Sequence, residues 1–370
     1  MINKIHPDLL NEVSTLSNKT LNCFVYSNDY IKSKQQFDKD KIDYLGYPFI
    51  DCFFAKMSYS QLLRYSELSE TNFITKSAKV FTLIDKAKNF MNVKKITTSL
   101  HTPTIAFIDT GISPHLDFLM PKNRIVHFKD LINDRTLPYD DNGHGTFVSG
   151  VCSGSGICSA KQFSGIAPNS NIVMIKALDK NGETSSNKIL EAMQYIFSIR
   201  KKYNIKVVCM SFGADYTGAN DPLQKGALSL WNSGLVVVAA AGNSGPKSMS
   251  IKSPGTSSRI ITVGGMDDGR LDSKLKIAEF SSRGPVESRF KPDLVAPSID
   301  ITSTSNNFVE GLYTKMSGTS VATPMIAGIC ALMLANSPKL SPDKIKLNLI
   351  NLCKPLTHNK NEEGYGYLQF

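Results

Sequence analysis

The distribution of apolar and polar residues changes near residue 95 of this 370-residue chain. After residue 100, near-continuous apolar runs alternate with segments of helical periodicity. The runs predict strands at 104–108, 171–177, 206–210 and 236–241, and the periodic segments predict helices at 187–203 and 221–233. Apolar strands separated by helices are typical of a parallel sheet with both faces covered. We therefore expect residues 96–370 to form an α/β fold of three layers with a mostly parallel central sheet.

The first 95 residues follow a different pattern. Segments rich in β-branched and aromatic residues predict strands at 21–26, 50–55 and 78–84, and short helices are predicted at 30–39 and 59–68. This succession predicts a small α+β domain of the β-α-β-β-α-β type over residues 1–95.

Three clusters rich in small residues each carry one polar residue suited to acyl transfer. Asp109 lies in Asp-Thr-Gly, His144 in Asn-Gly-His-Gly-Thr, and Ser320 in Ser-Gly-Thr-Ser-Val-Ala-Thr-Pro. A serine hydroxyl needs a neighbouring base, so we expect His144 to take its proton and Asp109 to orient the imidazole. The apolar run 321–333 predicts a buried helix that starts at or near Ser320, because Pro324 is tolerated only in a first turn.

A donor for the oxyanion is expected after the predicted strand 236–241. There Asn243 follows Gly242 in a turn, and its side-chain amide would donate alongside the backbone N–H of Ser320. Taken alone, Asn243 is a plain turn residue; the ordered Asp, His and Ser clusters favour the donor role.

These clusters and the sequence around them resemble the subtilisin-type serine endopeptidases (subtilases, peptidase family S8) from about residue 105 to the C-terminus. Further blocks similar to the family are 211–213, 240–243, 280–285 and 291–297, and segments 138–144 and 261–268 look closest to the intracellular, AprX-like branch. The resemblance implies a subtilisin-like fold and hydrolysis of peptide bonds through an acyl-enzyme.

The resemblance also implies that residues 1–95 are an inhibitory propeptide. Its C-terminal tail would pass through the active-site cleft, with an autoprocessing junction within residues 85–98. The alternative is a permanent N-terminal domain that is never cleaved.

By the same resemblance, several segments would bind the substrate. Ser211, Phe212 and Gly213 would pair with the substrate backbone as an added strand, with Gly182, Glu183 and Thr184 at the opposite edge. The pocket for the side chain before the cut would be walled by residues 252–255 and by Ala240, Ala241 and Gly242. Lys252 stands where relatives carry a small residue, so the pocket would accept acidic side chains; alternatively its stem reaches solvent.

The chain departs from the family pattern at three places. Phe147 replaces a usual histidine and Val321 a usual methionine, and both positions suit apolar packing. Many secreted relatives bind calcium in a loop soon after the catalytic histidine, but residues 149–165 contain no Asp or Glu. Calcium takes several carboxylate or carbonyl oxygens, so we expect neither this site nor a cofactor. Asp140-Asp141 and Asp267-Asp268 are at most weak ligands and are interpreted as solvated turn carboxylates.

Composition excludes several other functions. Lys and Arg number 42 against 32 Asp and Glu, a net charge of +10, but the basic residues are scattered and nucleic-acid binding is not indicated. No segment approaches the ~20 apolar residues of a membrane helix, and the N-terminus lacks a signal-peptide pattern. Seven cysteines without metal spacing suit reduced thiols, which favours a cytoplasmic location and leaves association with spores open.

Three functions remain open from the sequence. The favoured one is an active endopeptidase that acts on proteins or peptides and is made with an inhibitory N-terminal domain. A dedicated processing protease that activates one partner zymogen, as in spore germination, would show a narrow cleavage profile. A non-catalytic pseudoprotease is disfavoured because the candidate catalytic residues are all present.

Overall fold

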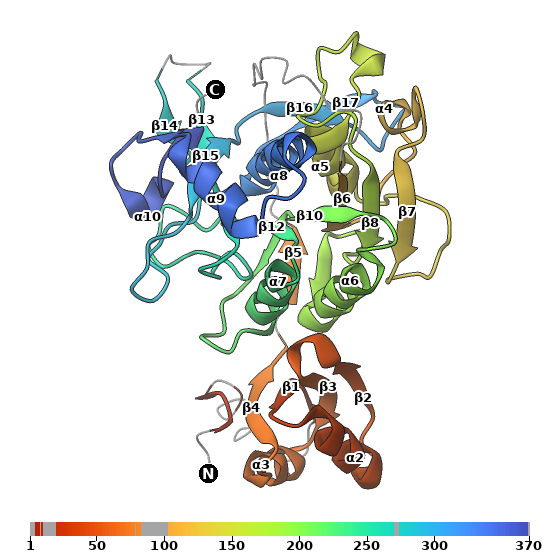
Figure 1. The fold of residues 1–370 in the computed structure, drawn as a ribbon, viewed down its shortest axis with the longest axis vertical. Coiled ribbons are helices and arrows are strands. Elements are labelled where there is room, and N and C mark those ends of the chain that lie inside the picture. Colours follow the sequence, from red (N-terminus) through yellow and green to blue (C-terminus); the bar gives the residue numbers. More distant parts are fainter. Residues whose placement is uncertain are drawn as a thin grey trace.

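The computed structural model describes residues 4–7, 9, 20–77, 79–82, 103–269 and 274–368, with 79–82 described as backbone. Figure 1 shows two units, a larger one with a central sheet between helices and a smaller one at the end that carries the N-terminus. The predicted boundary at residue 95 lies outside the described residues.

The larger unit is built on a sheet with the strand order β18-β19-β15-β13-β12-β10-β6-β8-β7, and β14 pairs with β13. From β15 to β7, every neighbouring pair is parallel. The strands are β6 (Thr104–Asp109), β7 (Ile125–Asp130), β8 (Ile172–Lys176), β10 (Ile205–Met210), β12 (Val236–Ala240), β13 (Ile261–Asp267), β14 (Lys276–Ile277), β15 (Leu294–Pro297), β18 (Cys353–Lys354) and β19 (Tyr367–Leu368). The predicted α/β architecture with a mostly parallel sheet is confirmed, because strands covered on both faces need continuous apolar sequence.

Helices cover both faces of this sheet. On one face α5 (His144–Ser153) packs against α8 (Thr319–Asn336), and on the other α6 (Ser186–Ile199) packs against α7 (Pro222–Asn232). Other elements of this unit are α4 (Leu116–Leu119), η3 (Ile157–Ser159), α9 (Pro342–Asn351), α10 (Lys360–Glu363) and the hairpin of β16 (Ile301–Thr304) and β17 (Tyr313–Met316). By length and composition α8 is apolar enough to cross a membrane, but 89% of it is buried inside the fold, as expected of a core helix.

The start of α8 near Ser320 agrees with the prediction, but the reason given for it was wrong. The helix begins at Thr319, so Pro324 lies in its second turn, not in its first. There it removes the N–H that would otherwise bond to the carbonyl oxygen of Ser320. Tight packing on all sides holds the helix together, since nearly every residue of α8 is buried.

The smaller unit has the predicted β-α-β-β-α-β order. Its elements are β1 (Leu21–Ser27), α2 (Tyr30–Asp40), β2 (Tyr44–Tyr47), η2 (Pro48–Ile50), β3 (Cys52–Met57), α3 (Tyr59–Glu67) and β4 (Thr71–Lys76). The four strands form one sheet in the order β2-β3-β1-β4. A capping box between Ser58 and Gln61 fixes the start of α3, and the side chain of Asp29 caps α2. Phe37, Phe53 and Tyr65 pack in the core beneath the helices.

The strand predicted at 78–84 does not belong to this small sheet, which corrects the sequence interpretation. β5 (Lys79–Thr82) lies instead between β9 (Glu183–Ser185) and β11 (Phe212–Ala214) of the larger unit and is antiparallel to both. The small sheet is completed by β4, which the sequence analysis missed. Pairing is decided by distant parts of the chain, so the pattern of β5 alone could not identify its partners.

The smaller unit rests on α6 and α7 (Figure 1). The hydroxyl of Tyr47 donates to the carbonyl oxygen of Asn187 at 3.1 Å, and Ser229 Oγ donates to the carbonyl oxygen of Phe49 at 2.9 Å. The ammonium of Lys225 lies 3.9 Å from the centre of the Tyr26 ring. Apolar residues of the two units share one core, so the interface resembles the packing inside a domain.

Candidate active site

Asp109 and His144 are brought together at the carboxyl end of the central sheet. Asp109 is the last residue of β6, and His144 is the first residue of α5. His144 Nδ1 lies 2.7 Å from Asp109 Oδ1, and both side chains are buried. His144 Nε2 has no hydrogen-bond partner among the described residues. The carboxylate therefore fixes the orientation of the imidazole through Nδ1 and leaves Nε2 able to exchange a proton.

Asp140 connects the turns that carry these two residues. Its Oδ1 accepts hydrogen bonds from Thr110 Oγ1 at 2.9 Å and from the backbone N–H of Gly143 at 2.9 Å. Its Oδ2 accepts from the N–H and the hydroxyl of Thr146, at 2.8 and 2.7 Å. Asp140 is 7% exposed, so its interpretation as a solvated turn carboxylate was wrong. It joins the end of β6 to the first turn of α5.

Lys176 makes a second connection between the same segments. It ends β8, next to Asp109 in the strand register, and its side chain is fully buried. Its ammonium donates to Asp141 Oδ1 at 2.6 Å, to the carbonyl oxygen of Thr110 at 2.5 Å and to that of Leu178 at 3.1 Å. Asp141 is itself exposed, so it remains a solvated turn carboxylate, and it also pairs with this buried lysine.

Substituting Lys176 by methionine is expected to lower kcat/KM for a peptide substrate by about 100-fold. The loss follows because the turns carrying Asp109 and His144 would no longer share one fixed donor, and small displacements of reacting groups are costly. Steady-state kinetics measures the effect, and Lys180→Met, an exposed lysine in the next turn, serves as the matched control. Equal rates for Lys176→Met and the control would contradict this role.

Asn243 is hydrogen-bonded to Thr319, the residue directly before Ser320. Ser320 is the second residue of α8, which follows Gly318. Asn243 Oδ1 accepts from the Thr319 N–H at 3.0 Å and from Thr319 Oγ1 at 2.9 Å. Both acceptor bonds orient the amide, and its buried Nδ2 has no partner among the described residues. A directed donor and the positive end of a helix dipole therefore lie beside the serine.

The helices that carry His144 and Ser320 are held together by an apolar cluster. Phe147 of α5 and Val321 of α8 both belong to it, together with Met325. The two departures from the family pattern are therefore packing residues, as expected.

The segments predicted to bind the substrate lie on either side of β5. In the register with β11, Phe212 is opposite Thr82 and Gly213 is opposite Phe81. In the register with β9, Glu183 is also opposite Phe81. Ser211 immediately precedes β11 and is buried, whereas Gly182 precedes β9 with φ of 73°. A segment of the chain itself thus occupies the place between the two edges that were assigned to substrate.

The predicted pocket wall is assembled, and Lys252 within it has a partner. The Lys252 N–H donates to the carbonyl oxygen of Ala241 at 2.8 Å, and its stem packs so closely on Gly242 that a Cβ there would lie 2.5 Å from Lys252 Cγ. Lys252 Nζ is 2.5 Å from Asp215 Oδ1. Ala240 is the last residue of β12 and is buried. The structure thus adds a carboxylate that neither sequence alternative for Lys252 had considered.

Carbonyl oxygens around the loop after α5 are bonded to a buried arginine. Arg124 is buried, and its guanidinium donates to the carbonyl oxygens of Ser153 and Ser170, at 2.5 and 3.1 Å, and to that of Asp117. Burial lowers the pKa of Arg124 to about 10. These carbonyl oxygens are of the type that calcium would use, and they are already bonded to a cation of the protein.

Among the described residues, one group of side chains could hold a metal ion, formed by His115, Asp117 and Cys158, whose ligand atoms lie within 4.8 Å of one another. Their atoms have other partners. His115 Nδ1 accepts from the Asp117 N–H and Nε2 contacts the carbonyl oxygen of Leu312, while the Asp117 carboxylate accepts from the Tyr313 hydroxyl and from loop N–H groups. The arrangement fastens the loop and supplies no step of the chemistry.

Sequence reasoning missed Lys176, Asp140 and Thr319 as parts of the site. Lys176 gave a signal, because a lysine in an otherwise apolar predicted strand needs a buried partner. Asp140 and Thr319 gave none, since polar residues in a turn are usually solvated.

Comparisons with known proteins agree with this geometry. Residues 101–367 match the sequence pattern of the subtilase family. The chain is 38% identical to serine protease AprX of Bacillus subtilis (strain 168) over 331 residues, which cover 82% of this chain and 74% of that protein. It is 34% identical to the thermophilic serine proteinase of Bacillus sp. (strain AK1), over 62% of this chain and 51% of that protein.

Two solved structures have a similar fold. Fervidolysin of Fervidobacterium pennivorans, a keratinolytic enzyme related to subtilisin, matches 95% of this chain and 60% of its own with a TM-score of 0.73 and 19% identity. Sphericase matches 75% of this chain and 95% of its own with a TM-score of 0.63 and 26% identity. The first likeness concerns the fold alone, and it includes the smaller N-terminal unit within its coverage.

Proposed function

Since this chain belongs to the subtilase family of serine proteases and is a hydrolase of peptide bonds, we propose that it is an endopeptidase that uses Ser320, His144 and Asp109 as its catalytic triad. The observation that carries the assignment is the 2.7 Å contact between His144 Nδ1 and Asp109 Oδ1, with Nε2 left for the serine proton. Protein or peptide substrates follow from the family.

In this mechanism Ser320 Oγ attacks the scissile carbonyl carbon while His144 Nε2 takes the hydroxyl proton. Asp109 stabilises the imidazolium that forms, and Asn243 Nδ2 donates to the oxyanion of the tetrahedral intermediate. The imidazolium then protonates the leaving amine, and a water activated by His144 hydrolyses the acyl-enzyme.

A fluorophosphonate probe tests this assignment directly, because it labels a serine only when the neighbouring base activates it. We expect one label on Ser320, found by peptide mass spectrometry, and no label after His144→Ala. A correctly folded chain that takes no label after the N-terminal unit has been removed would support the pseudoprotease alternative.

We further propose that the N-terminal unit is an intramolecular inhibitor. The supporting observation is β5, which lies between β9 and β11 where a substrate strand would pair, and so excludes another peptide. The docking of the unit on α6 and α7, with its shared apolar core, keeps β5 at a high effective concentration. Inhibition would then persist until the connection is cut and the unit leaves.

Autoprocessing is expected to release residues 1–83. β5 runs antiparallel to β11, and Thr82 lies opposite Phe212. In a substrate strand bound in the same register, the next residue along the strand would lie opposite Ser211. Ser211 directly follows β10, whose carboxyl end is beside that of β6 and Asp109. In this chain the residue after Thr82 is Leu83, so we expect cleavage to follow it. This position precedes the junction predicted within 85–98, which lies outside the described residues, and the mass of the released segment distinguishes the two.

Intact mass over time measures this processing. The wild type is expected to lose the N-terminal segment, and Ser320→Ala is expected to stay whole under the same conditions. If the wild type is able to take the fluorophosphonate label and yet stays whole when unlabelled, the N-terminal unit is a permanent domain.

We also propose that the protein acts in the cytoplasm, because all seven cysteines are free thiols in the fold and five of them are buried. Association with spores and service as a dedicated processing protease are finer forms of the same proposal. A cleavage profile restricted to one sequence would support the processing role.

A further inference from the structure

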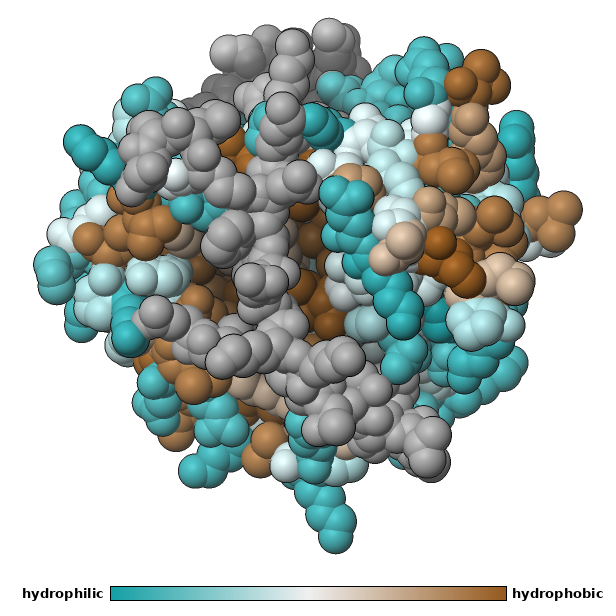
Figure 2. Space-filling model, turned by 90° about the horizontal axis from the view of Figure 1, so that it is seen from above, coloured by the Kyte–Doolittle hydropathy of each residue, from teal (hydrophilic) through white to brown (hydrophobic). Residues whose placement is uncertain are grey.

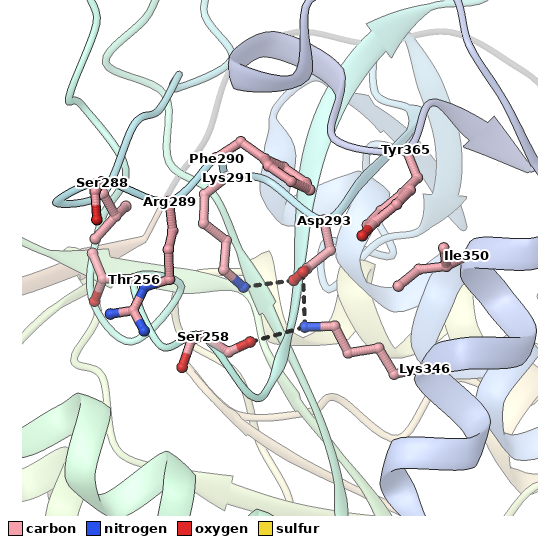
Figure 3. Close-up of a pocket in the computed structure, with 11 residues that line it drawn as sticks. Thr256, Ser258, Ser288, Arg289, Phe290, Lys291, Asp293, Lys346, Ile350 and Tyr365 are labelled. Atoms are coloured by element: carbon pink, nitrogen blue, oxygen red, sulfur yellow. Dashed lines mark hydrogen bonds and ion pairs between the residues drawn. The ribbon is translucent and has the colours of Figure 1, made fainter.

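A cavity of about 480 Å³ lies at the end of the sheet opposite the candidate catalytic residues. Asp109 ends β6, whereas this cavity is beside the segments that lead into β13 and β15. Figure 3 shows side chains from these segments and from α9 converging on its centre. The walls include Thr256, Ser258, Arg289, Phe290, Lys346 and Tyr365. Its size falls in the range of sites for small molecules.

Positive charge exceeds negative charge on the walls of this cavity. Arg289, Lys291 and Lys346 line it, and Asp293 is the carboxylate among the lining residues. Lys291 Nζ is 2.6 Å from Asp293 Oδ2, and Lys346 Nζ is 2.7 Å from Asp293 Oδ1 (Figure 3). The lining therefore holds one carboxylate, paired with two lysines, and a third cation, Arg289. Glu287 pairs with Arg289 at 2.9 Å, but both side chains are about half exposed, and such pairs exchange readily.

Two of these cations supply charge and not direct hydrogen bonds. Lys291 also donates to Thr262 Oγ1 and to the carbonyl oxygen of Ile260, and Lys346 donates to backbone carbonyl oxygens. Among the donors left for a ligand are Arg289 and the hydroxyl of Thr256. Thr256 is 2% exposed, and its Oγ1 has no partner among the described residues. Both residues line the cavity (Figure 3).

The apolar part of the wall suits the body of a small molecule. Phe290 and Tyr365 stand edge to face, with ring centres 5.3 Å apart, and Ile350 of α9 lines the same cavity. We propose that this cavity is an effector site for a small organic carboxylate with a flat apolar body, bound through Arg289 and the Thr256 hydroxyl. The planar guanidinium matches a carboxylate with two parallel hydrogen bonds.

The loop that carries Thr256 also reaches the proposed substrate pocket. Four residues earlier, Lys252 packs on Gly242, and Ser253 exchanges two backbone hydrogen bonds with Ala214 at the end of β11, each 2.9 Å. A ligand held by Thr256 would therefore restrict the motion of the loop from Lys252 to Thr256, and this would change substrate binding more than the chemical step. This effect on catalysis rests on the proposed endopeptidase function, whereas ligand binding does not.

Proton uptake gives an independent sign of binding. Burial, together with the charges of Lys346 and Arg289, lowers the pKa of Lys291 to about 7 against the opposing attraction of Asp293. At pH 8 much of Lys291 is therefore neutral in the empty cavity. A bound carboxylate favours the ammonium form, so binding takes up protons at this pH and not at pH 6, where the lysine is already charged.

Calorimetric titration with phenylacetate, and with phenylacetamide as the neutral probe of the same shape, tests the site. We expect phenylacetate to bind at least about tenfold more tightly than phenylacetamide, and Arg289→Gln to weaken it by a similar factor. Glu287→Gln, which frees Arg289, is expected to keep or improve binding. Titrations at pH 8 in buffers of different ionisation enthalpy should show proton uptake. Equal binding of both probes, or no effect of Arg289→Gln, would overturn the site.

Peptide hydrolysis tests the effector role separately. Saturating phenylacetate is expected to change KM at least twofold in the wild type and to leave Arg289→Gln unchanged. Binding without a change in KM would overturn the effector role. If the protein takes no fluorophosphonate label, the proposed catalytic function fails, and calorimetry still decides whether the anion site exists.

Discussion

Ser320→Ala is expected to lower kcat by about 10⁶-fold with the fold intact. The substitution removes only the hydroxyl group, and without it neither proton transfer to His144 nor formation of the acyl-enzyme takes place. The residual rate reflects binding and the oxyanion donor alone, so KM should change little. Hydrolysis of a fluorogenic peptide by the wild type and by the variant, both freed of the N-terminal unit, measures the difference.

Ser149→Ala is the matched control for this experiment. Ser149 is a buried serine of α5 whose hydroxyl has no partner among the described residues, so its loss removes the same atom from the same part of the core. Activity should survive it. If Ser149→Ala and Ser320→Ala lose activity alike, the effect comes from packing and Ser320 is not the nucleophile.

Asn243→Ala is expected to lower kcat by roughly 10²- to 10³-fold while KM stays within a few-fold. The amide of Asn243 is aimed by two bonds from Thr319 to its Oδ1, which leaves Nδ2 as a donor already oriented before substrate binds. Such a donor meets negative charge that exists only in the transition state, so its loss appears in kcat.

Asn243→Asp separates donation from shape. The carboxylate has nearly the same size and can still accept from Thr319, but it offers no donor and adds a negative charge beside the oxyanion. We expect kcat to fall at least as far as in Asn243→Ala. Thr319→Val, which keeps one of the two orienting bonds, is expected to lose less. Wild-type kcat in Asn243→Asp would exclude the oxyanion role.

Much of the fold could be predicted because its strands and helices are marked locally. The strands of the central sheet are apolar runs that end in small or polar residues, and the amphipathic helices between them have clear periodicity. The boundaries moved by only a few residues, as for α6, which ends at Ile199 and not at 203. Pro324 shows the limit of a local rule, since packing around α8 tolerates a proline in its second turn.

The partners of β5 could not be predicted. Its residues form a strand in either setting, and only the folded molecule shows that it pairs with β9 and β11 and not with β4. The same limit applies to charged side chains. Asp140 looks like a surface residue in the sequence, yet it is buried and joins the two turns of the candidate active site, because burial of a charge depends on what lies around it.

The sequence by itself determined the family, the α/β class and the identity of the candidate catalytic residues, since each is carried by short motifs with local conformational requirements. Only the tertiary structure decided which of these residues touch, that the chain inserts its own strand between the two substrate-binding edges, and that a cationic cavity lies behind the loop of Lys252. These features join residues far apart in the chain, and their free energies come from packing and charge in three dimensions, which a local pattern does not encode.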